Sequence, residues 1–191
     1  MNLKETALVI IDLQKGIAGR EGFQPYSAAE IIEKNEKLVA KFANTEALIV
    51  FVHVKNYGPE AMKPVTDGTP MVTGTLPDDF SDFVIGTAYD KNVTNVIHVT
   101  KHNWGAFHGT DLDVQLRRRG IKNIILTGIA TTIGVDTTAR EAAQHGYEIV
   151  TVSDAMTDFN GELNEAIIKN IFPRLSKVRT TEEILTEIDG K

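Results

Sequence analysis

The sequence predicts one doubly wound α/β domain, in which helices cover both faces of a mostly parallel six-stranded sheet in a three-layer α/β/α arrangement. Two observations lead to this prediction. Apolar, β-rich runs alternate with helical patterns along the whole chain, without a break in composition. The first run is continuously apolar, which is typical of a strand covered on both faces. A chain of 191 residues can bury a full core, so we expect residues 1–191 to form a single domain.

Six strands and five helices are expected in alternation. The strands are predicted at 6–12, 47–54, 96–100, 122–127, 147–153 and 178–180. The helices are predicted from Ser27 to about 43, from 109 or 110 to 119, and at 134–145, 161–175 and 181–188. Ser27 with Glu30 forms a capping-box pattern, and Pro173 is expected to distort the last turn of its helix.

A long irregular stretch, about 55–95, separates the second and third strands and is rich in glycine and proline. Loops of this length in a compact domain are usually functional, so we expect it to serve as a lid or subunit contact. A short helix is predicted within it at 78–84.

Composition excludes several classes of function. The net charge of −6 argues against a nucleic-acid-binding face, and no stretch is long and apolar enough for a membrane span. The absence of cysteine excludes disulfides, cysteine-ligated zinc and thiol catalysis. The N-terminus runs directly into a strand and does not read as a signal peptide. We therefore expect a cytoplasmic protein that acts on a small molecule.

Three features follow strands whose carboxyl ends should share one edge of the sheet, where ligands bind in such folds. Asp12 follows the first strand, Lys101 the third, and the segment Gly128–Gly134 the fourth. A carboxyl at the end of a buried strand suits proton transfer, although it could also cap a loop. The lysine could hold that carboxylate ionised, bind an anionic substrate, or simply lie on the surface.

The segment from Gly128 to Gly134 leads from a strand into a helix. Backbone N–H groups at such a place can stabilise an oxyanion, although a plain strand-to-helix turn would have the same sequence character. The spacing matches neither G-x-G-x-x-G nor the phosphate loop, so nucleotide binding is not predicted. The loop after Lys101 should fold over the strand ends. The residues expected to line the substrate pocket are Gln14, Trp104, Phe107, Ile129, Ala130, Thr131, Thr132 and Ile133.

The order of these motifs resembles the isochorismatase-like hydrolase superfamily, whose fold is Rossmann-like. The motifs are Asp12-Leu-Gln14, Thr100-Lys101 with Trp104-Gly-Ala-Phe107, Thr127-Gly-Ile-Ala-Thr131, Thr137-Thr-Ala-Arg-Glu-Ala142 and Val152-Ser-Asp-Ala-Met-Thr-Asp-Phe159. The resemblance implies catalytic roles for Asp12 and Lys101, and places Gly134 where the cysteine-hydrolase branch has its nucleophile. It also implies a non-proline cis peptide at Ile129–Ala130 and a homo-oligomer.

The glycine at 134 makes the chain more similar to the isochorismatase branch, which cleaves a vinyl ether with an aspartate as general acid. The metal motif of nicotinamidases is absent, since the corresponding place reads His53-Val-Lys-Asn56, and we expect no metal and no cofactor. Three hypotheses follow. The first is a hydrolase of a small anionic metabolite, by analogy isochorismate, giving pyruvate and 2,3-dihydro-2,3-dihydroxybenzoate. The others are an amide or ester hydrolase of the same fold and a catalytically silent metabolite-binding homologue.

Overall fold

The centre of the protein is a six-stranded sheet in which every pair of neighbouring strands is parallel. The computed structural model describes residues 1–55, 59, 61, 65–68 and 76–190. The strands lie in the order β3-β2-β1-β4-β5-β6. They are β1 (Thr6–Ile11), β2 (Leu48–Val54), β3 (Val96–Lys101), β4 (Asn123–Ile129), β5 (Glu148–Thr157) and β6 (Lys177–Arg179). The predicted fold class is confirmed.

The strand order reverses direction between β1 and β4. The chain builds outward from β1 to β2 and β3, returns to the other side of β1, and then adds β4, β5 and β6. At the switch between β1 and β4, the connections after the two strands leave in opposite directions. This opens space beyond their carboxyl ends.

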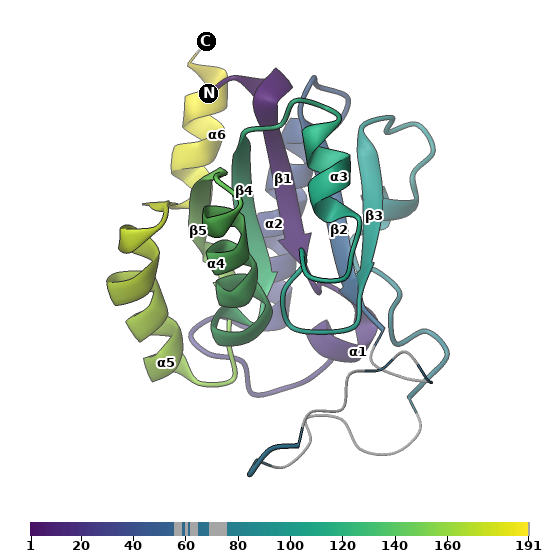
Figure 1. Cartoon of the computed structure of the whole chain (residues 1–191), viewed down its shortest axis with the longest axis vertical. Helices are drawn as coiled ribbons and strands as arrows, with labels where there is room; N and C mark the ends of the chain where they lie inside the picture. The colour runs from purple at the N-terminus through teal and green to yellow at the C-terminus, as the bar shows by residue number, and fades with distance from the viewer. Residues whose placement is uncertain (56–58, 60, 62–64, 69–75, 191) are drawn as a thin grey trace.

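Helices cover both faces of the sheet (Figure 1). On one face, α2 (Ala28–Phe42) and α6 (Thr181–Asp189) pack through Ile31, Phe42 and Ile184. On the other, α3 (Leu112–Arg117) and α4 (Asp136–Gln144) pack through residues such as Leu116 and Ala139. Two short helices, α1 (Lys15–Ala18) and α5 (Gly161–Ala166), follow β1 and β5.

The two helical layers explain the continuous apolar run of β1. Leu8 and Ile10 belong to the core on the α2 side, whereas Val9 and Ile11 belong to the core on the α4 side. Every residue of β1 is buried. The predicted capping box at the start of α2 is also confirmed: Glu30 N–H donates to Ser27 Oγ, and Ser27 N–H donates to the Glu30 carboxylate.

The helix expected at 78–84 is wrong: residues 78–81 form a turn, and the nearest helix is the 3₁₀ helix η2 (Gly86–Tyr89). Besides turn hydrogen bonds such as Asp82 N–H to Asp79 O, the backbone of this segment bonds to the loop after β1. Lys15 N–H donates to Asp82 O, and Gly16 N–H donates to Phe80 O. Part of the rest of the expected lid, at 56–58, 60, 62–64 and 69–75, lies outside the described residues.

Two other predicted helices are divided. The one expected at 134–145 begins earlier, as the π-helical turn η3 (Thr131–Val135), and continues as α4. The one expected at 161–175 consists of α5, the π-helical η4 (Ile167–Ile171) and the 3₁₀ turn η5 (Phe172–Arg174). Pro173 cannot donate a backbone hydrogen bond, which accounts for the tighter last turn. The four-residue α1 and the 3₁₀ turn η1 (Leu3–Glu5) were too short to produce a periodic pattern.

No helix in the described part of the chain combines the length and apolar character needed to cross a bilayer.

Candidate active site

Asp12 is the first residue beyond β1, and its backbone leaves the strand in the left-handed region with φ of 53°. Aspartate is one of the few residues other than glycine that is found there with some frequency. Its N–H still donates to Val52 O at 2.9 Å, so the residue remains fixed to the edge of the sheet. The side chain turns into the protein, and Asp12 is only 4% exposed.

Lys101 is the last residue of β3 and forms an ion pair with Asp12, with 2.7 Å between Nζ and Oδ2. β2 lies between β1 and β3, so the lysine and aspartate side chains together bridge two strand spacings, about 10 Å. The same ammonium donates to Asn103 O at 3.1 Å and Trp104 O at 2.9 Å. An ammonium has three N–H groups, and these three acceptors account for all of them.

The environment of the Asp12 carboxyl has two opposing effects on its protonation. Burial raises the pKa of Asp12, and the neighbouring charge of Lys101 counteracts part of that rise. Oδ2 is engaged by the lysine, whereas Oδ1 is buried and has no hydrogen-bond partner among the described residues. The two oxygens of the carboxyl therefore have unequal surroundings.

Gly134 lies directly beside this carboxyl. A Cβ at this position would lie 3.2 Å from Asp12 Oδ2 and 2.9 Å from Ile11 Cγ2, a distance that requires Ile11 to move. Residue 134 is therefore packed closely against Asp12 and Ile11, and a side chain there would require its neighbours to move. Residues 12, 101 and 134 therefore lie next to one another, as expected from the sequence.

The turn between β4 and α4 brings the backbone of Gly134 to Asp12. The Ile129–Ala130 peptide is cis, as the resemblance implied. Asp158, after β5, anchors the turn: its Oδ2 accepts from Thr132 N–H at 2.7 Å and its Oδ1 from Phe159 N–H at 2.7 Å. Thr131 is buried and donates to Thr157 O. Ile129 and Ala130 are also buried, and Thr132 and Ile133 are partly exposed.

Three of the expected pocket residues have other surroundings. The amide of Gln14 is occupied by backbone: Nε2 donates to Val54 O and Phe80 O, and Oε1 accepts from Val54 N–H. The ring of Phe107 packs in the core, stacked on His145 at 5.0 Å. Trp104 is 58% exposed, and its contact with the site is made by its carbonyl oxygen. In this structure the Gln14 amide and the Phe107 ring are therefore engaged by the protein itself.

The residues that the sequence did not single out are those that hold the site together, namely Thr138, Glu141 and Asp158. All three lie within motifs of the resemblance, Thr138 and Glu141 in 137–142 and Asp158 in 152–159, but the resemblance gave them no role. Thr138 and Glu141 are also three residues apart and therefore share one face of a helix, which was a further signal.

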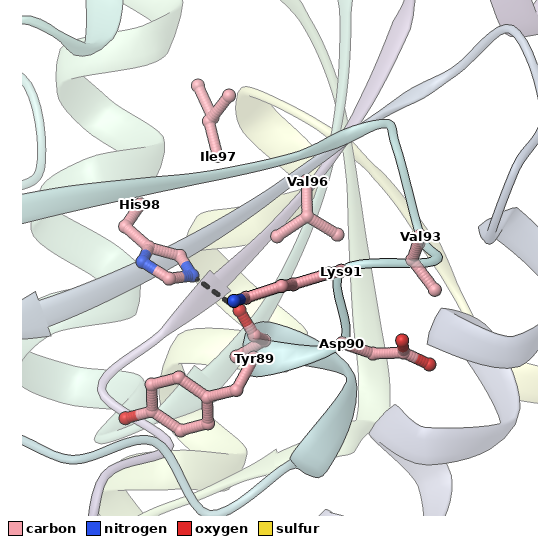
Figure 2. A pocket seen from close by; sticks show the side chains of 8 residues that line it. Tyr89, Asp90, Lys91, Val93, Val96, Ile97 and His98 are labelled. Atoms are coloured by element: carbon pink, nitrogen blue, oxygen red, sulfur yellow. Dashed lines mark hydrogen bonds between the residues drawn. The ribbon is translucent and has the colours of Figure 1, made fainter.

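Among the residues that the structure describes, no cluster of three histidine, cysteine or acidic side chains is arranged to hold a metal ion. A groove of about 250 Å³ lies elsewhere, between η2 and the first half of β3 (Figure 2). It is lined by residues that include Tyr89, Lys91 and His98, and the His98 ring bonds to Ala88 O. Since Lys101 ends the same strand, the groove lies away from the Asp12–Lys101 pair.

The site is thus a buried aspartate–lysine pair at the switch point of a doubly wound parallel sheet. The isochorismatase domain family model matches residues 6–183. The isochorismatase family protein YwoC of Bacillus subtilis (strain 168) is 46% identical over 192 residues, covering 98% of this chain and 96% of that protein. Nicotinamidase 3 of Arabidopsis thaliana is 38% identical over 179 residues, covering 89% and 82%.

The fold comparison agrees with the sequence comparisons. The structure of an isochorismatase family protein from Burkholderia thailandensis matches with a TM-score of 0.89 and 39% identity, covering 97% of this chain and 96% of that one. The chain therefore belongs to the isochorismatase family and is a hydrolase of that family.

Proposed function

We propose that the protein hydrolyses a small metabolite with Asp12 as its acid–base residue, and that cleavage of a vinyl ether such as isochorismate is the closest reaction. One observation carries the proposal. The buried Asp12 carboxyl is held through Oδ2 by Lys101, has an unpartnered Oδ1, and faces a position without a side chain. This arrangement provides a buried proton donor, and it contains no thiol.

The chemistry requires Asp12 to begin in its protonated form, which burial favours by raising its pKa. The acid gives its proton to the terminal vinyl carbon, and the ether carbon becomes an oxocarbenium ion. Water adds to that carbon and returns a proton to Asp12. The resulting hemiketal passes its hydroxyl proton to the ether oxygen and breaks the bond between that oxygen and the former vinyl carbon, giving a ketone and an alcohol. For isochorismate these products are pyruvate and 2,3-dihydro-2,3-dihydroxybenzoate.

Lys101 supports this cycle without touching the substrate. Its three N–H groups are taken by Asp12 and by two backbone carbonyls, so it has no free donor for an anionic group. Its charge stabilises the aspartate anion that remains after proton transfer. Binding of the substrate's own negative charge therefore requires groups other than Lys101.

The test is formation of pyruvate from isochorismate, followed with a coupled lactate dehydrogenase assay. We expect turnover by the natural chain and a loss of at least about 100-fold in the Asp12→Asn variant, because the acid is removed. Asp189→Asn is the matched control, since Asp189 is an exposed residue at the end of α6. Absence of pyruvate above the Asp12→Asn level would overturn the vinyl ether assignment.

A second candidate is hydrolysis of an amide or ester by a water molecule that ionised Asp12 activates. The likeness to nicotinamidase 3 supports it. A panel of primary amides and esters, assayed for ammonia or acid release beside the Asp12→Asn variant, tests this function. A ligand that raises the melting temperature without being turned over would favour the third hypothesis, a metabolite-binding homologue.

A further inference from the structure

The ammonium of Lys101 is held by the loop that follows it. Two of its three acceptors, Asn103 O and Trp104 O, are backbone carbonyls of that loop. The position of the ammonium relative to Asp12 therefore depends on where the backbone at 103 and 104 lies. Since Trp104 itself is mostly exposed, burial of its own side chain does not fix this part of the loop.

Two side chains of α4 hold the next part of the loop. Ala106 N–H donates to Thr138 Oγ1 at 3.1 Å, and Phe107 N–H donates to Glu141 Oε2 at 3.0 Å. The Thr138 hydroxyl in turn donates to Gly134 O at 2.6 Å. One helix thus ties the loop of Lys101 to the turn that carries Gly134.

Gly105 is what allows the Glu141 carboxylate to approach the loop. A Cβ at position 105 would lie 2.1 Å from Glu141 Oε2 and 2.4 Å from its Cδ. Any other residue at 105 would displace the carboxylate from its bond to Phe107 N–H. The glycine and the glutamate therefore form one fitted contact between the loop and α4.

We propose that Glu141 is a positioning residue for the Asp12–Lys101 pair, acting through the backbone N–H of Phe107 and the carbonyls at 103 and 104. Glu141 itself contacts neither Asp12 nor the ammonium in any hydrogen bond of the described residues. This role rests on the proposed function of Asp12 as the acid–base residue. Its measurable consequence is on the protonation of Asp12, because Lys101 is the charge that lowers the pKa of that carboxyl.

The experiment is a ¹³C NMR titration of the full-length protein labelled at aspartate carboxyl carbons, with the Asp12 signal assigned by its loss in Asp12→Asn. Glu141→Ala is expected to raise the pKa of Asp12, because a loosened Lys101 opposes the effect of burial less well. Glu141→Gln keeps an acceptor for Phe107 N–H and should leave the pKa close to that of the natural chain. Gly105→Ala should act like Glu141→Ala. Gln144→Ala, at an exposed position on the same helix, is the control.

The sign of the shift separates positioning from a direct effect of charge. Removing a negative charge near Asp12 would lower its pKa, the opposite of the expected rise. An unchanged or lowered pKa in folded Glu141→Ala overturns the proposal. If Glu141→Ala does not fold, an unchanged pKa in Gly105→Ala overturns it equally. A shift in Glu141→Gln as large as that in Gly105→Ala also contradicts it.

The titration needs no substrate, so its outcome is independent of whether the proposed reaction occurs. If neither the pyruvate assay nor the amide assay detects turnover, the proposed function is wrong. The effect of Glu141 on the pKa of Asp12 would still be decided by the titration. Where turnover is found, Glu141→Ala should reduce kcat about tenfold with little change in KM, because the altered group acts on the proton donor. Glu141→Gln should retain most of the kcat.

Discussion

At the scale of single residues, the central feature of the site is the Asp12 carboxyl, whose two oxygens have different environments. Asp12 Oδ2 faces the ammonium of Lys101, and Oδ1 is buried without a partner. An unpartnered buried oxygen costs stability, and proteins keep such groups mainly where function needs them. Burial and the nearby cation have opposite effects on the pKa, and burial is the larger of the two.

The pH dependence of turnover distinguishes the two candidate reactions. Burial raises the pKa of Asp12 above the 3.8 of an ordinary aspartate, so the protonated form persists to higher pH. A general acid must be protonated, and kcat/KM for vinyl ether cleavage should therefore fall as pH rises through that raised pKa. A general base must be ionised, and kcat/KM for amide hydrolysis should rise over the same interval. The measurement is a pH–rate profile of the natural chain; a limb that persists unchanged in Asp12→Asn would contradict both assignments.

At the scale of elements, the junction of β1 and β4 sets the position of the site. Ile11 pairs with Gly128, and Gly128 has φ of 118°. A Cβ at 128 would lie 2.1 Å from Ile11 O. The two strands can therefore approach this closely, one residue before Asp12, only because residue 128 is glycine.

We expect Gly128→Ala to destabilise the protein by about 3 kcal/mol or more, because it combines backbone strain with a clash against β1. Gly120→Ala is the matched control: Gly120 also has a positive φ, of 69°, but a Cβ there would meet nothing within 4 Å. That variant should lose only about 1 kcal/mol. Urea unfolding gives both free energies, and equal losses would show that the contact with Ile11 is unimportant.

At the scale of the whole molecule, the parallel sheet gathers into one site residues that are far apart in the sequence. Asp12, Lys101 and Gly134 come from three connections, after β1, β3 and β4, that meet at the carboxyl edge of the sheet. The helix α4 then joins two of these connections through Thr138 and Glu141. The site is therefore a property of the sheet and one helix together.

We also propose, from the resemblance, that the chain assembles into a homo-oligomer. Sedimentation equilibrium at micromolar concentration should then give a mass that is a multiple of 21.0 kDa. Dilution should not dissociate a permanent assembly, since its interface would be large and apolar. A mass of 21.0 kDa at all concentrations would refute this prediction.

The sequence alone determined the fold class and the place of the site. Buried parallel strands are continuously apolar, and this local signal gave six strands, their order along the chain and the edge where Asp12 and Lys101 meet. The capping box of α2 was likewise readable, because its two hydrogen bonds lie within four residues. The short helix expected at 78–84 was wrong because that segment bonds to the loop at 13–16, a contact over more than sixty positions.

Only the tertiary structure decided how the side chains around the site are used. Gln14 and Phe107 are residue types that often line pockets. The Gln14 amide, however, is hydrogen-bonded to backbone groups, and the Phe107 ring packs in the core. Lys101 proved to have no free donor, because loop carbonyls from 103 and 104 complete its hydrogen bonds. Such assignments depend on which groups come within 3 Å of one another after the sheet has formed, and residue type and spacing do not contain that information.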